Sequence, residues 1–149
     1  MIQNNRLAEQ IGAWYNCWFR LRGVYQAWAE KNGLTYNTLF TLYEIDKHVD
    51  GCTQKQLCDY LMLSKQTVSA ILKKLEQSGY IIRKSGVGDR RKNQVTFTPT
   101  GKAYAQPILA GLKQMELDGY GMLSEEALDE IVAVATNLAD SLEKSGGII

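Results

Sequence analysis

Positively charged side chains are concentrated between residues 65 and 92. This segment holds eight lysines and arginines but only two carboxylates, Glu76 and Asp89, so its net charge is +6. The whole chain carries a net charge of +1, which leaves −5 for the remaining residues. A protein that is acidic elsewhere and basic in one segment is suited to contact a polyanion there, and duplex DNA is the first candidate.

Two short helices are expected around the start of this basic segment. Thr53 and Gln56 have the spacing of a capping box, in which each side chain satisfies a backbone amide at the helix start. Ser64 can cap a second helix, and Ser78-Gly79 ends it. The 3.6-residue repeat predicts inward faces at Leu57, Tyr60 and Leu61 in the first helix and at Val68, Ile71, Leu72 and Leu75 in the second.

Two short strands joined by a basic loop are expected after the second helix. Residues 80–84 and 93–98 have strand character, and the loop between them, residues 85–92, is too long and too rich in glycine for a tight hairpin. This loop should project as a wing. The order of helices, strands and loop predicts a winged helix-turn-helix, so the expected fold is mainly α with a small β wing.

The second helix supplies the side chains that could read DNA. In a helix-turn-helix this helix enters the major groove with its N-terminal residues at the base edges. Gln66 could pair with adenine, and Lys65 could donate to guanine. Ser64 and Thr67 suit phosphates as well as bases, so the sequence leaves open which of these residues reads a base.

The expected wing carries a second group of DNA contacts. Asp89 could hold the guanidinium of Arg91 in a fixed direction, which suits a narrow minor groove. Arg90 and Lys92 are better placed for phosphates. The DNA-binding residues predicted from helix and wing together are Ser64, Lys65, Gln66, Thr67, Ser69, Lys73, Lys74, Arg83, Asp89, Arg90, Arg91 and Lys92.

Long amphipathic helices are expected at both ends of the chain. Thr98-Pro99 opens a helix through about Gly119, and Ser124 opens the last one. The N-terminal helix has an apolar stripe that must pack on the chain's own C-terminal helices or on another subunit. Its members are Leu7, Ile11, Trp14, Trp18, Leu21, Tyr25 and Trp28. The predicted division is a winged helix-turn-helix at residues 34–99, flanked by a helical dimerisation region at residues 1–33 and 100–149.

Five short motifs carry a family resemblance. They are Leu57-Cys58-Asp59-Tyr60-Leu61, Ser64-Lys65-Gln66-Thr67-Val68-Ser69, Leu75-Glu76-Gln77-Ser78-Gly79-Tyr80-Ile81, Asp89-Arg90-Arg91 and Phe97-Thr98-Pro99-Thr100-Gly101. In this order they resemble the MarR family of bacterial transcriptional regulators. The resemblance implies a homodimer whose first and last helices interlock and place two winged domains on a pseudo-palindromic DNA site. It also puts Asp89 and Arg91 at the wing's motif positions, whereas Cys58 stands where alanine is usual.

The same resemblance implies a small effector, often aromatic or phenolic. Such an effector would bind between the dimerisation helices and the DNA-binding lobe and alter the spacing of the recognition helices. Arg22 could meet an anionic group on it. The residues that could line this site are Trp14, Tyr15, Trp18, Arg22, Tyr36 and Tyr43. Ordinary core packing remains the alternative, because aromatic side chains at helical spacing are more often core.

Other chemistry finds little support in the sequence. Some similar regulators sense peroxides through a cysteine of the first helix, but no lysine or arginine obviously activates Cys17, so we expect a buried, inert thiol. His48, Cys52 and Cys58 lack a clear fourth metal ligand, and neither a metal nor a cofactor is expected. A single histidine, with no nucleophile elbow and no phosphate-cradling loop, predicts no enzymatic activity.

These observations lead to one expected function and two alternatives. We expect a cytoplasmic, dimeric DNA-binding repressor that a small molecule releases from its operator. Neither a basic leader followed by an apolar stretch nor an apolar run of about 18 residues is present, so no membrane association is expected. The alternatives are a thiol- or metal-responsive regulator of the same fold and a winged-helix module that binds protein.

Overall fold

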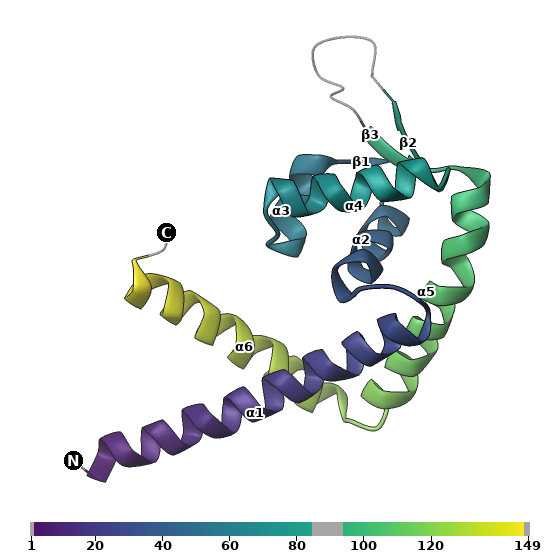
Figure 1. Ribbon diagram of the computed structural model, residues 1–149. Helices are drawn as coiled ribbons and strands as arrows, with labels where there is room; N and C mark the ends of the chain where they lie inside the picture. Colours follow the sequence, from purple (N-terminus) through teal and green to yellow (C-terminus); the bar gives the residue numbers. More distant parts are fainter. Residues whose placement is uncertain (1, 85–93, 148–149) are drawn as a thin grey trace. The chain divides into compact units, whose positions relative to one another are not determined.

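The computed structural model describes residues 2–84 and 94–147, and for residues 2–4 it describes the backbone only. The described chain forms six helices and three strands in two compact units, residues 1–109 and 110–149 (Figure 1). The elements are α1 (Ile2–Lys31), α2 (Tyr36–Lys47), β1 (Cys52–Thr53), α3 (Gln54–Leu61), α4 (Lys65–Gln77), β2 (Ile81–Lys84), β3 (Gln94–Phe97), α5 (Pro99–Tyr120) and α6 (Glu125–Gly146). The expected fold class is confirmed: the protein is mainly helical with a small antiparallel sheet.

Both predicted helix starts in the helix-turn-helix are confirmed. At α3 the Thr53 hydroxyl accepts a hydrogen bond from the backbone amide of Gln56 at 3.2 Å. In return, the backbone amide of Thr53 donates to the side-chain oxygen of Gln56 at 2.8 Å. At α4 the hydroxyl of Ser64 accepts from the Thr67 amide at 3.1 Å. Each cap satisfies an amide that has no partner inside its helix, and this sets where α3 and α4 begin.

The sheet contains a strand that the sequence did not predict. Its order is β1-β3-β2, with Cys52 opposite Val95 and Ile81 opposite Phe97. Strand β1 has two residues, which is too short to show an alternating pattern of apolar and polar side chains. It fastens the start of α3 to the base of the wing, because Thr53 is both its last residue and the cap of α3.

Apolar side chains from α2, α3, α4 and the sheet form the core of the winged domain. The fully buried members are Leu39, Leu42, Ile45, Cys52, Leu57, Val68, Leu72, Ile81 and Val95. The prediction that Tyr60 faces inward was wrong. Tyr60 is 60% exposed, and its ring lies 5.4 Å from the ammonium group of Lys47 on α2. The aromatic ring therefore packs along a neighbouring lysine at the surface instead of entering the core.

Helices α1 and α6 remain widely exposed in the single chain. Leu7, Trp18 and Val24 of α1 are each more than half exposed, and none of the residues of α6 is buried. Ser124 caps α6 as predicted, and Glu125 and Glu126 lie at its positive end. Among the described residues, no helix combines the length and the apolar character needed to cross a membrane.

Replacing Thr53 by alanine should lower the free energy of unfolding by about 1 kcal/mol, because the change removes the cap of α3. Urea denaturation followed by circular dichroism measures this loss. Thr53→Ser keeps the hydroxyl and should retain most of the stability. Equal stability of the alanine variant and the wild type would show that the capping box contributes nothing.

Candidate nucleic-acid interface

Helix α4 has one apolar side and one polar side. Val68, Leu72 and Leu75 are buried, and helical geometry places Gln66 and Lys73 on the opposite side. Both of these polar residues are exposed, as are Lys65 and Lys74 at the edges of the polar side. The structure therefore places four of the predicted DNA-binding residues of α4 on its outward side, whereas Thr67 and Ser69 are half-buried. No acidic residue occupies the first turn, so the positive end of the helix dipole is not neutralised there.

The start of α4 is fixed by hydrogen bonds, and these bonds already engage two of the predicted DNA-binding side chains. The hydroxyls of Ser64 and Thr67 lie 2.9 Å apart and share a hydrogen bond. The amide group of Gln54 on α3 donates to the backbone carbonyl of Lys65 at 3.2 Å. Sequence reasoning missed Gln54, although its place directly after the cap of α3 was a usable signal. This bond joins the first turns of the two helices, so Gln54 positions the start of the recognition helix.

The wing residues are only partly described. Arg83 on β2 is half-buried, and its Nε lies 3.4 Å from a carboxylate oxygen of Glu76 on α4. The pair joins the base of the wing to the recognition helix. The predicted contacts Asp89, Arg90, Arg91 and Lys92 lie outside the described residues.

The predicted effector residues fall into two groups. In the first, the guanidinium of Arg22 lies 5.6 Å from the ring centre of Tyr36. Phe40, which is not in the predicted effector set, joins Tyr36 to Tyr43 with ring centres at 4.8 and 6.2 Å. Its place one helical turn after Tyr36 was the available signal. This group connects α1 to α2 through aromatic and cation–π contacts.

The second group lies further toward the N-terminus of α1. Tyr15 and Trp18 have ring centres 6.5 Å apart, and Phe19 stacks against both at 6.1 Å. All three side chains are exposed, as is Trp14. No ring contact joins this group to Tyr36 or Tyr43 among the residues that the structure describes.

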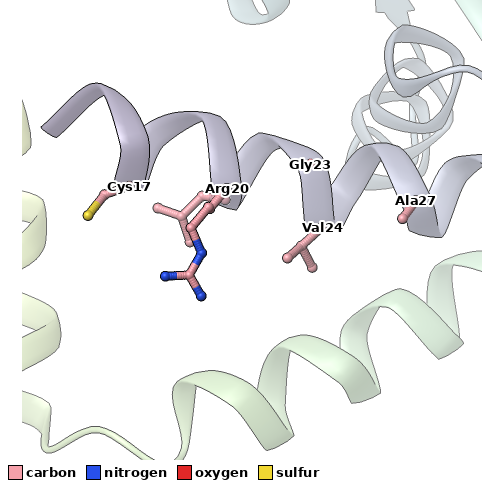
Figure 2. Close-up of a pocket in the computed structure, with 6 residues that line it drawn as sticks. Cys17, Arg20, Gly23, Val24 and Ala27 are labelled. Atoms are coloured by element: carbon pink, nitrogen blue, oxygen red, sulfur yellow. The ribbon is translucent and has the colours of Figure 1, made fainter. Parts of the chain in front are cut away.

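A separate hollow runs along α1. Figure 2 shows the side chains of Cys17, Arg20, Val24 and Ala27 pointing to one side of the helix, and Leu21 and Gly23 complete the lining. None of these six residues belongs to the predicted effector set. The helical repeat puts Cys17, Val24 and Ala27 on the side away from Ile11 and Trp18. Helix α1 thus presents exposed apolar side chains in two directions.

Comparison with known proteins supports the resemblance to the MarR family. A family model described as the MarR family matches residues 32–92. The transcriptional regulator SarZ of Staphylococcus epidermidis is 26% identical over 145 residues, which cover 97% of each chain. The structure of NMB1585, a MarR family regulator from Neisseria meningitidis, aligns with a TM-score of 0.80 and 29% identity, covering 93% of this chain and 95% of that one. These matches show that the chain is similar to MarR-family regulators over nearly its whole length.

The MarR fold is also seen in the DNA complex of MepR from Staphylococcus aureus. That structure aligns with a TM-score of 0.73 at 24% identity and covers 87% of this chain and 94% of the other. The predicted resemblance is confirmed: the family model, the sequence relatives and the solved structures all support a DNA-binding, winged-helix transcriptional regulator of the MarR family. MarR-family proteins are generally not enzymes, which agrees with the class expected from the sequence.

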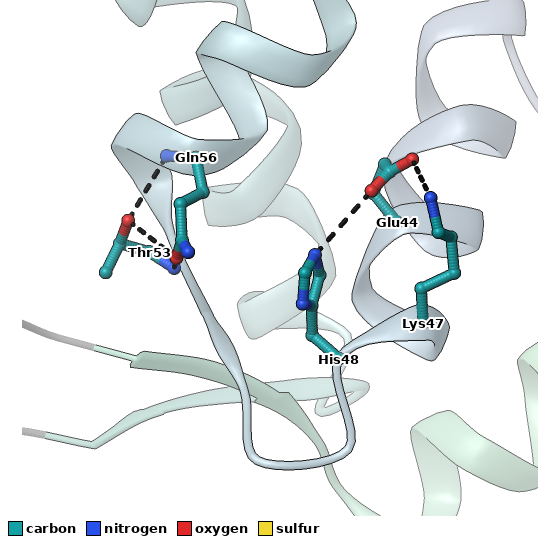
Figure 3. A network of polar contacts seen from close by, with 5 residues as sticks. All are labelled: Glu44, Lys47, His48, Thr53 and Gln56. Carbon is teal, nitrogen blue, oxygen red and sulfur yellow. Dashed lines mark hydrogen bonds and ion pairs between the residues drawn. The ribbon is translucent and has the colours of Figure 1, made fainter.

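The polar side chains at the end of α2 do not support the alternative of a metal-responsive regulator. Glu44 is buried and bonds Lys47 at 3.2 Å, while its other oxygen lies 3.7 Å from His48 (Figure 3). The same figure shows the capping pair of α3 beside these side chains. Among the described residues, no group of three or more histidine, cysteine or acidic side chains could hold a metal ion. This finding covers His48, Cys52 and Cys58, the three candidate ligands.

The three thiols differ in their surroundings. Cys52 is buried and Cys58 is half-buried, whereas Cys17 is exposed in the single chain. The prediction of a buried Cys17 was therefore wrong for the single chain. Cys17 lies on an exposed side of α1, where it lines the hollow. Burial, and secondarily the carboxylate of Glu44, raises the pKa of Cys52 to about 11.

This shift predicts a pH-dependent loss of stability. The folded protein holds the Cys52 proton more tightly than the unfolded chain, so the stabilisation is complete below the usual thiol pKa of 9.0 and is lost as the pH rises toward 11. The measurement is the free energy of unfolding across this pH range for the wild type and for Cys52→Ala. The two proteins share every other titrating group, so the difference between their curves isolates Cys52. The advantage of the wild type should shrink with rising pH. Two parallel curves would contradict a buried neutral thiol.

Proposed function

We propose that this MarR-family protein is a homodimeric repressor that binds a pseudo-palindromic DNA operator and leaves it when a small aromatic or phenolic effector binds. The observation that carries the DNA-binding part is the polar surface of α4. This surface carries the amide of Gln66 and the ammonium groups of Lys65 and Lys73, all three exposed, on a helix whose opposite side buries Val68, Leu72 and Leu75. A helix of this kind fits the major groove, where amides and ammonium groups distinguish bases.

The remaining predicted contacts complete the proposed interface. Ser69 and Lys74 flank the polar surface of α4, and the wing supplies the rest. Arg91, held in direction by Asp89, would read the minor groove, while Arg90 and Lys92 would bind phosphates. MepR, which has the same fold, has been seen bound to DNA. A basic helix beside a basic loop is better explained by DNA than by a protein partner.

Two exposed apolar sides of α1 support the homodimer. A helix that is apolar in more than one direction must be covered in more than one direction. Ile11 and Trp18 lie on one side and Val24 on the other, and all three are at least 44% exposed. We propose that a second copy covers part of this surface, with residues 1–33 and 100–149 forming the dimerisation region and residues 34–99 the DNA-binding domain. The two half-sites of such an operator lie about 34 Å apart, too far for one recognition helix to contact both, so each half-site requires its own helix.

The aromatic contacts between α1 and α2 support an effector site. Arg22 stacks on Tyr36, and it takes part in none of the ion pairs found among the described residues. Its charge is therefore available to a carboxylate or phenolate, and Tyr36 and Tyr43 supply aromatic surface. We propose that Trp14, Tyr15 and Trp18 extend this site along α1. Repression follows if the operator overlaps a promoter, because a bound dimer would then exclude the polymerase.

DNA binding is tested by selecting duplexes from a random-sequence library on the wild-type protein and measuring affinity at several salt concentrations. Affinity should fall steeply with salt, because lysines and arginines release counterions from the phosphates. Gln66→Ala should cost about 1–3 kcal/mol at one base position of each half-site, whereas Lys65→Ala, if it contacts a phosphate, should reduce the salt slope by about 1 for each protomer. Lys144→Ala, at the end of α6, is the control for simple loss of a lysine. Failure to enrich any duplex would refute the proposal and favour a protein-binding module.

The dimer is tested by placing a charge in the apolar stripe. Ile11→Glu should shift the protein from dimer to monomer, since an ionised carboxylate is costly to bury at an interface. Sedimentation equilibrium measures the mass, and DNA affinity should fall with it. Asn16→Glu adds the same charge on a polar side of α1 and should leave the dimer intact. A dimer that survives Ile11→Glu would exclude this stripe from the interface.

A further inference from the structure

The end of the recognition helix is tied to the start of α5 by an unusually dense set of contacts. After α4, Gly79 adopts a positive φ of 73° and its amide bonds the carbonyl of Glu76 at 2.9 Å. The amide of Tyr80 bonds the carbonyl of Leu75, also at 2.9 Å. These two bonds form a Schellman motif, which turns the chain sharply into β2. The direction in which the chain leaves α4 is thus determined by backbone hydrogen bonds.

Thr98 connects this turn to α5. Its hydroxyl donates to the carbonyl of Gly79 at 2.6 Å and accepts from the amide of Gly101 at 2.9 Å. Its own amide donates to the carbonyl of Tyr80 at 3.0 Å. One side chain therefore caps α5 and grips the end of α4 at the same time. Figure 1 shows α5 starting beside the base of the wing, at this end of α4.

Two tyrosines close the junction. The rings of Tyr80 and Tyr104 are stacked, with centres 4.1 Å apart and planes 9° from parallel. Gly101 is buried beneath them, and a Cβ at this position would overlap the carbonyl oxygen of Tyr80. The backbones of α5 and of the turn after α4 thus touch directly, and the stacked rings hold them on the next helical turn. We call Gly79, Tyr80, Thr98, Gly101 and Tyr104 the α4–α5 joint.

We propose that Tyr80 and Tyr104 are positioning residues for DNA binding: their stack holds the recognition helix and the base of the wing at a set angle to the first turns of α5. Both rings are only half-buried, and the core of the winged domain is built from other residues. Folding of the domain therefore does not require the stack. The backbone bonds and Thr98 set how the chain leaves α4, and the stack adds the side-chain contact that holds α5 against this turn. The inference rests on the proposed function, since a set angle matters only if two recognition helices must meet two half-sites.

A loosened joint has a particular signature. Each winged domain keeps its own contacts, so binding to a single half-site is unchanged. Binding to two half-sites at once is weakened, because the second helix no longer arrives at the required place. Simple destabilisation behaves differently, since it lowers the fraction of folded protein and weakens both kinds of binding equally.

The experiment measures the ratio of affinities for a duplex with both half-sites and for one with a single half-site, using the duplex selected on the wild type. Tyr104→Leu and Tyr80→Leu remove the stack but keep apolar bulk. Each should lower the ratio by about threefold to tenfold, the equivalent of one stacked ring pair, and the double variant should lower it no further. Tyr104→Phe keeps the ring and should restore the wild-type ratio. Ile45→Val, a core change in α2, shows what lost stability alone does to the ratio.

The outcomes separate the two hypotheses. Two results would contradict a positioning role for the joint. In the first, the wild type binds DNA but neither leucine variant changes the affinity ratio. In the second, Ile45→Val lowers the ratio as much as a leucine variant of the same melting temperature does. Leucine variants whose separate effects add in full would also overturn it, because the rings would not be acting as a pair. Wild-type protein that binds no duplex would refute the proposed function, and this inference with it.

Discussion

The apolar side of α4 determines how the rest of the protein can work. Burying Val68, Leu72 and Leu75 against the core stabilises the domain by roughly 1.5–3 kcal/mol for each large side chain. The partly exposed ion pair between Glu76 and Arg83 can contribute only about 0–1 kcal/mol. Hydrophobic burial therefore decides which side of α4 faces outward. Gln66 and Lys73 are exposed as a consequence of that burial, and among the described residues no hydrogen bond or ion pair holds them there.

The two ends of α4 are specified locally, which is why the sequence predicts them well. Ser64 satisfies an amide at the first turn, and Gly79 permits the left-handed turn after the last one. The same logic holds for the capping box at Thr53 and the cap at Ser124. Each signal depends on residues within four positions of one another, so no knowledge of the tertiary structure is needed to read it.

Three of the features that sequence reasoning missed depend on contacts between distant segments. Strand β1 exists because Cys52 finds Val95, and its two residues carry no pattern of their own. Tyr60 has the helical spacing of a core residue, yet Lys47 of a neighbouring helix offers its ring a surface position. The stack of Tyr80 on Tyr104 requires the close approach that Gly101 permits. Periodicity reports which side of a helix is apolar but not which element will cover it.

Geometry matters more than total charge for a regulator of this kind. The chain as a whole carries only +1, so long-range attraction to DNA is weak and depends on one basic segment. A single helix with a few base contacts gives modest affinity, and linking two such helices raises affinity only when both reach their half-sites together. Under the proposed function, an effector would need to displace neither helix from its groove. A small change in the direction of one helix relative to the other would be sufficient, since it would remove the benefit of linkage while leaving each domain folded.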